Sequence, residues 1–110
     1  MDLKTIIEKI KEQGVIPPGD LAEYRLWLAA EYGYLSEKLS QILKEKPERW
    51  LEIRQRSDTS SDKIADRLWE TTDSGKEETT LKISLKTIEK LSSAISSRLK
   101  MYETEARLQQ

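Results

Sequence analysis

Residues 81–106 read LKISLKTIEKLSSAISSRLKMYETEA, and their apolar side chains recur every three or four residues. This spacing places them on one face of an α-helix, in the pattern of coiled coils. We therefore predict a helix with an apolar stripe, the C-terminal seam, which must pack against another helix. The seam consists of Leu81, Leu85, Ile88, Ile95, Leu99 and Tyr102, with Ser92 and Ala106 in the same register.

The stripe continues towards the N-terminus through Leu68 and Ile64, displaced by about one position. A straight helix drifts by about 20° per heptad, so this offset fits one continuous helix over residues 60–107. A turn at residues 73–75 is the alternative, because a glycine inside a helix costs about 1 kcal/mol relative to alanine. We favour the continuous helix, since no proline follows Gly75, and we expect Gly75 to be a point of close contact.

Three more helices are predicted over about residues 3–12, 21–45 and 47–55. Asp2 suits an N-cap, and Asp20 begins a capping-box pattern. Pro47 is expected to end the second helix and to begin the third, because proline lacks the N–H that a helix interior needs. Val15 and Ile16 are expected to tuck into the core between the first two helices. Turn and polar residues at 13–19 and 57–61 separate the elements.

The composition suits a helical protein with a modest core. The chain has 110 residues, of which 36% are hydrophobic and 35% charged, with few glycines and prolines. We predict an all-α single domain over residues 1–110, an elongated helical hairpin or bundle of about four helices. The core of a single copy looks thin, so we expect a homo-oligomer held together by the C-terminal seam.

The residue types argue against catalysis. Histidine and cysteine are both absent, which removes the commonest general base, the commonest metal ligand and the thiol nucleophile. The carboxylates alternate with lysine and arginine at helix-pair spacing, as in Glu77 or Glu78 with Lys82, which is typical of a solvated face. We therefore expect no enzyme activity, no cofactor and no bound metal.

Two clusters are candidates for binding. A net charge of −1 provides no global basic field, yet basic residues surround Trp50. The candidate nucleic-acid contacts are Arg49, Arg54, Arg56, Lys63 and Arg67. The alternative for them is a salt-bridged surface, because acidic residues interleave. The candidate partner surface is aromatic and comprises Tyr24, Trp27, Tyr32 and Tyr34; the alternative is burial between helices.

The stretches EYGYLS (31–36), WLEIR (50–54) and DRLWE (66–70) precede a helix rich in leucine, lysine and serine. Together they resemble small all-helical proteins encoded by bacteriophages and prophages. The resemblance implies an accessory or host-inhibitory role from an early or recombination gene cluster. The resemblance identifies no functional residue in this chain.

The leading hypothesis is a non-catalytic helical interaction protein that acts through self-association and a protein-binding surface. The alternatives are a nucleic-acid-binding accessory protein and a small protein inhibitor of a host factor. No apolar run is long enough to span a bilayer, and the first residues lack the form of a signal peptide. We therefore expect no membrane partner and a cytoplasmic location.

Overall fold

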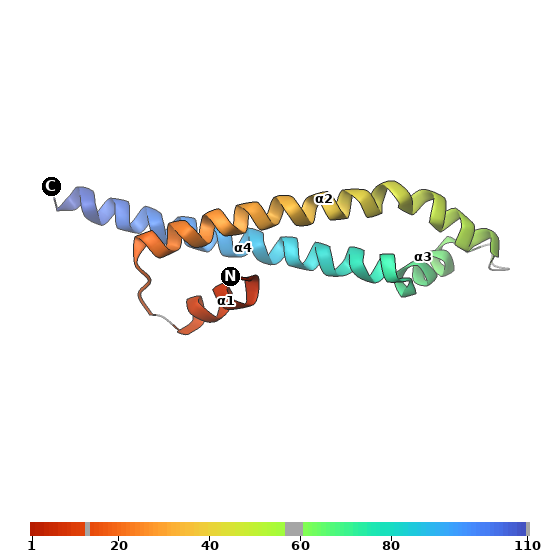
Figure 1. Cartoon of the computed structure of the whole chain (residues 1–110), viewed down its shortest axis with the longest axis horizontal. Coiled ribbons are helices and arrows are strands. Elements are labelled where there is room, and N and C mark those ends of the chain that lie inside the picture. Colours follow the sequence, from red (N-terminus) through yellow and green to blue (C-terminus); the bar gives the residue numbers. More distant parts are fainter. Residues whose placement is uncertain (13, 57–60, 110) are drawn as a thin grey trace. The chain divides into compact units, whose positions relative to one another are not determined.

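The computed structural model describes residues 1–12, 14–56 and 61–109. The described residues form four α-helices and no strand, so the all-α prediction is confirmed. The helices are α1 (Leu3–Glu12), α2 (Pro18–Arg56), α3 (Asp62–Thr71) and α4 (Asp73–Leu108) (Figure 1). Within these described ranges, no helix carries the apolar length that a bilayer crossing requires.

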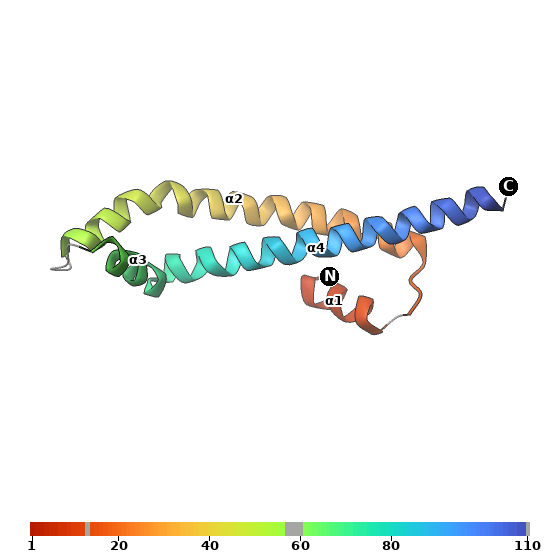
Figure 2. The same cartoon turned by 180° about the vertical axis from the view of Figure 1, so that it is seen from behind.

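The chain divides into two compact units, and α2 and α4 each pass through both. The α1 unit comprises Met1–Gly33 with Lys86–Gln110, and the α3 unit comprises Tyr34–Leu85. Within each unit α2 and α4 lie side by side and run in opposite directions, as both views show (Figures 1 and 2). The antiparallel pairing that a helical hairpin requires is therefore present in each unit.

The α1 unit holds most of the fully buried apolar side chains. Three helices and the connector before α2 contribute to this core: Ile6, Ile16, Leu21, Tyr24, Leu28, Ile88 and Ile95 are each at most 3% exposed. In the α3 unit the inner face of α2 is only half-buried at Leu35, Leu39 and Ile42. The buried apolar side chains are thus concentrated in the α1 unit, where α1 packs with α2 and α4.

Helix α1 has the predicted bounds, and Asp2 caps it. The Asp2 carboxylate accepts hydrogen bonds from the backbone N–H of Thr5 at 2.8 Å and from its hydroxyl at 2.7 Å. These hydrogen bonds lower the pKa of Asp2, the hydroxyl contributing most. Of the two residues predicted to terminate the helix, Gln13 and Gly14, the first lies outside the described residues. Ile16 is buried as predicted, but Val15 is 80% exposed, so its predicted place in the core is wrong.

Helix α2 corrects three predicted boundaries. It begins at Pro18, three residues before the predicted start, because proline fits the first helical position and needs no N–H there. Asp20 is therefore inside the first turn and is not the cap. The helix also continues through Pro47 to Arg56, so residues 47–55 are its last turns and no separate helix. Proline leaves the carbonyl of Leu43 without its usual N–H partner in the helix, and Leu43 is an exposed residue.

The predicted continuous helix over residues 60–107 is also wrong, because the chain breaks at Thr72. This residue is extended, with φ −72° and ψ 158°, and ends α3. Its hydroxyl donates to the carbonyl of Trp69 at 2.6 Å and accepts from the N–H of Gly75 at 3.0 Å. Thr72 is therefore the N-cap of α4, with Asp73 in the first turn. The start predicted at residue 60 and most of the polar loop at 57–61 lie outside the described residues.

Gly75 is a point of close contact, although the prediction assumed a continuous helix and the contact instead depends on the break at Thr72. A Cβ atom built there would clash with the carbonyl oxygen of Trp69 and would lie 2.7 Å from its carbonyl carbon. The backbone turn at Thr72 folds α3 back over this glycine, so the break and the glycine belong together. Gly33, in the middle of α2, has nothing within 4 Å of the same built atom.

Candidate interaction surfaces

The C-terminal seam is largely used inside the chain itself. Leu81, Leu85, Ile88 and Ile95 are at most 9% exposed, whereas Leu99 and Tyr102 are half-buried. The register was predicted correctly as far as Tyr102, beyond which Ala106 is exposed. Since four of the six seam residues already pack within one copy, they offer little side-chain surface to a second copy. Self-association stays a prediction.

The four aromatic residues of α2 do not share one environment. Tyr24 is 3% exposed and has the amine of Lys9 5.9 Å from its ring centroid, so for Tyr24 burial is the correct alternative. Trp27 is half-buried, and both lie in the α1 unit. Only part of the predicted aromatic surface is therefore accessible.

The two accessible tyrosines have different polar partners. Tyr32, in the α1 unit, donates its hydroxyl hydrogen to the carboxylate of Glu89 at 2.9 Å. This hydrogen bond, and then the negative charge of Glu89, raise the pKa of Tyr32. Tyr34, in the α3 unit, is 55% exposed and has the amine of Lys38 4.9 Å from its ring centroid.

The candidate nucleic-acid cluster is partly neutralised. Arg54 forms an ion pair with Asp62 and lies over the ring of Trp50. Arg49 lies 3.5 Å from the carboxylate of Glu45 and donates to the hydroxyl of Ser74 at 2.9 Å. Arg56, Lys63 and Arg67 are exposed. The five basic side chains therefore do not form one free cationic surface.

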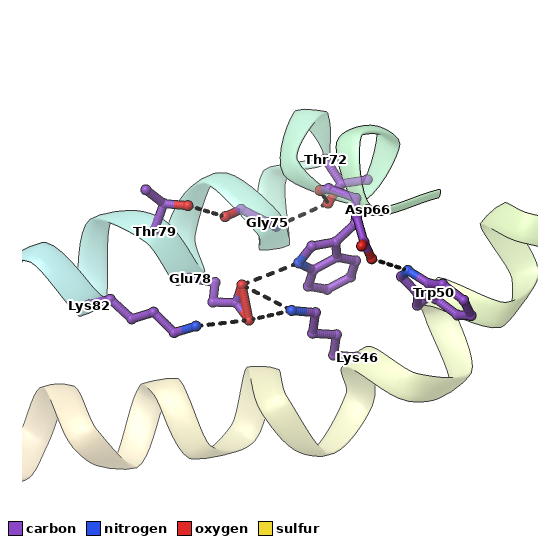
Figure 3. A network of polar contacts seen from close by, with 9 residues as sticks. Lys46, Trp50, Asp66, Thr72, Gly75, Glu78, Thr79 and Lys82 are labelled. Atoms are coloured by element: carbon purple, nitrogen blue, oxygen red, sulfur yellow. Dashed lines mark hydrogen bonds and ion pairs between the residues drawn. The ribbon is translucent and has the colours of Figure 1, made fainter. Parts of the chain in front are cut away.

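Glu78, a residue of the α3 unit with several polar partners, was predicted from its spacing to Lys82 to lie on a solvated face. It is only 6% exposed, so that placement is wrong. Its carboxylate accepts hydrogen bonds from the Lys46 amine at 3.0 and 3.3 Å and from the Trp69 indole at 3.4 Å. Figure 3 shows Lys46 of α2 and Lys82 of α4 pointing at this carboxylate, with Lys82 at 3.8 Å. We call Lys46, Trp69, Glu78 and Lys82 the Glu78 network.

The network keeps Glu78 ionised despite its burial. Burial on its own would raise the pKa of this carboxyl, but hydrogen bonds from Lys46 and Trp69 and the charges of both lysines outweigh it. The pKa of Glu78 is therefore lowered. The signal was present in the sequence, because Glu78 continues the seam register three residues before Leu81. A carboxylate at a seam position needs buried partners.

A hollow with a mixed apolar and charged lining lies on the α1 unit and was not anticipated from the sequence. Its volume is about 420 Å³, and its lining includes Val15, Ile16, Met101 and Tyr102. Val15 and Met101 are 80% and 63% exposed. The Tyr102 hydroxyl donates to the carbonyl of Ile16 at 2.8 Å, which fastens the connector before α2 onto α4. The walls of the hollow are thereby tied together.

No protein family model, curated protein or solved structure matches this chain. Its function is therefore inferred from its own surfaces.

Proposed function

We propose that this protein is a non-catalytic helical interaction protein, and that it binds another protein at the hollow of the α1 unit. The observation that carries the proposal is the exposure of Val15 and Met101 beside a recess of about 420 Å³. Large apolar side chains gathered at one exposed site mark interaction surfaces in soluble proteins. Because the Tyr102 hydroxyl holds the carbonyl of Ile16, part of this surface is formed before a partner arrives.

The chemistry of the hollow suits a protein side chain as its occupant. The apolar part of its lining favours an aliphatic or aromatic anchor, while Arg98 and Glu105 in the same lining offer one cation and one anion for orientation. A methionine wall adapts to the shape of such an anchor. In this proposal the buried seam residues from Leu81 to Ile95 stabilise the fold, and only Tyr102 at the end of the seam also lines the hollow where the partner binds.

Nucleic-acid binding is supported less well. Arg49 and Arg54 each lie against a carboxylate, and the net charge of the chain is −1. Phosphate binding depends on several unneutralised cations acting together. We therefore keep this alternative only as an outcome of the experiments below.

The test is differential capture from a bacterial lysate, the source suggested by the resemblance to phage proteins. The bait is the wild-type chain, the Met101→Glu variant or a matched control, Leu26→Glu, whose leucine is 73% exposed in the same unit. We expect one or more proteins to bind the wild type and the control but to lose at least tenfold in recovery with Met101→Glu. Recovery that is equal for all three baits overturns the proposal.

A mass measurement in solution by light scattering accompanies the capture. A wild-type mass that is a multiple of the single chain, and that falls to one chain only for Met101→Glu, identifies a second copy as the partner at the hollow. If the mass of Met101→Glu is still a multiple of the single chain, self-association uses a surface other than the hollow. If that multiple persists and no captured protein depends on Met101, the hollow is not a binding site.

A further inference from the structure

The side chains of helix α3 are segregated by chemical type around the helix axis. Residues four apart lie one above the other on a helix, so this ten-residue helix carries four rows. The rows are apolar and buried (Ala65, Trp69), acidic (Asp62, Asp66, Glu70), cationic (Lys63, Arg67) and apolar but exposed (Ile64, Leu68). Apart from Thr71, which ends the cationic row, each row consists of one class of side chain, although the signs of charge alternate along the sequence.

Two of the rows attach α3 to its own unit. Ala65 and Trp69 are 0% and 2% exposed. In the acidic row, Asp66 accepts a hydrogen bond from the indole of Trp50 at 2.8 Å, and Asp62 pairs with Arg54. Figure 3 shows the Asp66 and Trp50 side chains meeting between α3 and α2. The buried and acidic rows therefore contact α2 and α4. The cationic row and the exposed apolar row are not used in these contacts.

The two remaining rows form a surface that we call the α3 outer face. Ile64 and Leu68 are 44% and 38% exposed. Beside them Lys63 and Arg67 are exposed and form no ion pair with any part of the chain that the structure describes. Like charges four residues apart destabilise a helix by about 0.2–0.5 kcal/mol. The outer face thus combines exposed apolar surface with two cations that form no ion pair among the described residues, although the acidic row lies on the same helix.

We propose that the α3 outer face docks an acidic amphipathic helix of a partner protein. The apolar residues of that helix lie against Ile64 and Leu68, and its carboxylates lie beside Lys63 and Arg67. A helix fits because its own side chains recur at the four-residue spacing of the two rows, and helices bind through such anchors. The two positive charges favour a negatively charged partner and increase the rate of association.

A protein partner fits this face better than a nucleic acid. A phosphate backbone has no apolar row to bury Ile64 and Leu68, and the face carries only two cations. Its four members also include no aromatic ring on which a base can stack. This inference rests on the proposed function as a protein-binding module, but it concerns a surface of the α3 unit and not the hollow.

The test is fluorescence anisotropy with a labelled helical peptide. The probe carries leucine and glutamate in adjacent four-residue rows, and its twin carries lysine in place of every glutamate. We expect the wild type to bind the acidic peptide at least tenfold more tightly than the twin. The double variant Lys63→Glu with Arg67→Glu should reverse this preference. The matched control, Lys44→Glu with Lys76→Glu, makes the same charge change at two exposed lysines of the same unit and should keep the wild-type preference.

Several outcomes overturn the inference. One is a control that loses the acidic peptide as fully as the α3 variant, because general charge then explains binding. Another is an Ile64→Gln variant that binds the peptide as tightly as the wild type, because the apolar row is then unused. A third is a single-stranded oligonucleotide that binds more tightly than the peptide and is lost in the α3 variant. Circular dichroism must first show that each variant is folded.

The two proposals fail independently. Absence of peptide binding together with Met101-dependent capture overturns the inference and leaves the hollow intact. Peptide binding that reverses with charge, without Met101-dependent capture, supports the α3 outer face and removes the hollow.

Discussion

The side-chain amine of Lys46 lies 3.0 Å from the carboxylate of Glu78, which is only 6% exposed, and so joins α2 to α4 through a buried charge. A buried carboxylate is costly unless hydrogen bonds replace its lost water. Here Lys46 and the indole of Trp69 provide that replacement. The pair therefore specifies one arrangement of α2, α3 and α4 in the α3 unit.

The first prediction concerns the charge of Glu78. A Glu78→Gln variant keeps the shape of the side chain but leaves the amine of Lys46 without its counter-charge. We expect a loss of about 1–3 kcal/mol in the free energy of unfolding, because Lys46 itself is partly exposed to water. Urea unfolding followed by tryptophan fluorescence measures it. Glu77→Gln removes the same charge at an exposed neighbour and should change stability by less than about 0.5 kcal/mol. Equal losses in both variants would contradict the buried network.

The second prediction is the pH dependence of that contribution. The pKa of Glu78 is lowered in the folded chain, so the folded state favours the ionised form. Its stabilisation is complete above the pKa of an unfolded glutamate, about 4.3, and is lost as the pH falls through the lower folded value. The stability gap between the wild type and Glu78→Gln should therefore be constant from about pH 6 to 7 and shrink below about pH 4. A gap that widens on acidification would show that the sign is wrong.

Local periodicity was sufficient to predict the seam and the helical class. The three- and four-residue spacing from Leu81 to Tyr102 is a property of the chain alone, and burial follows it. Extended three residues towards the N-terminus from Leu81, the same register reaches Glu78. Judged by its residue type and its spacing to Lys82, Glu78 was expected to be solvated. Whether a carboxylate can be buried at a seam position depends on partners from another helix, such as Lys46. Identifying those partners requires the register of both helices.

The helix boundaries depended on tertiary contacts that the sequence does not display. Pro47 interrupts one backbone hydrogen bond, but Lys46 and Trp50 on either side of it are anchored to α4 and α3. Thr72 breaks the long segment because Trp69 is buried next to Gly75. A threonine followed by an acidic residue is a usable N-cap signal. Here the continuous apolar stripe was given more weight.

The third prediction compares two helical glycines. Gly75→Ala places a methyl group against the backbone of Trp69, where the nearest atoms belong to main chain and cannot rotate away. We expect a loss of about 1–3 kcal/mol or more in unfolding free energy and a change in Trp69 fluorescence. Gly33→Ala has open space and an ordinary helical backbone, so it should stabilise by about 0.5–1 kcal/mol. Urea unfolding of both variants is the check, and a harmless Gly75→Ala would contradict the close approach.

The fourth prediction asks whether the seam packs within one copy or between copies. Ile95→Ala removes a side chain that is 1% exposed and should cost about 2–5 kcal/mol. If the seam is internal, the loss is independent of protein concentration. Ile83→Ala, on the same helix but 62% exposed, should cost less than about 0.5 kcal/mol. Thermal unfolding over a hundredfold range of concentration measures both. A midpoint of the wild type that rises with concentration, and a loss in Ile95→Ala that varies with it, would instead assign the seam to self-association.

The fifth prediction concerns the bond that ties the connector to α4. Tyr102→Phe removes the hydroxyl that donates to the carbonyl of Ile16 at 2.8 Å and keeps the ring. We expect a loss of about 0.5–1.5 kcal/mol in unfolding free energy and faster proteolysis within residues 14–17. Tyr34→Phe removes a hydroxyl from an exposed ring of the α3 unit and should leave both quantities unchanged. If the hollow needs this bond to hold its shape, Tyr102→Phe also weakens capture of the Met101-dependent partner, whereas Tyr34→Phe does not. Unchanged proteolysis and unchanged capture in Tyr102→Phe would mean that the connector is held by the burial of Ile16 alone.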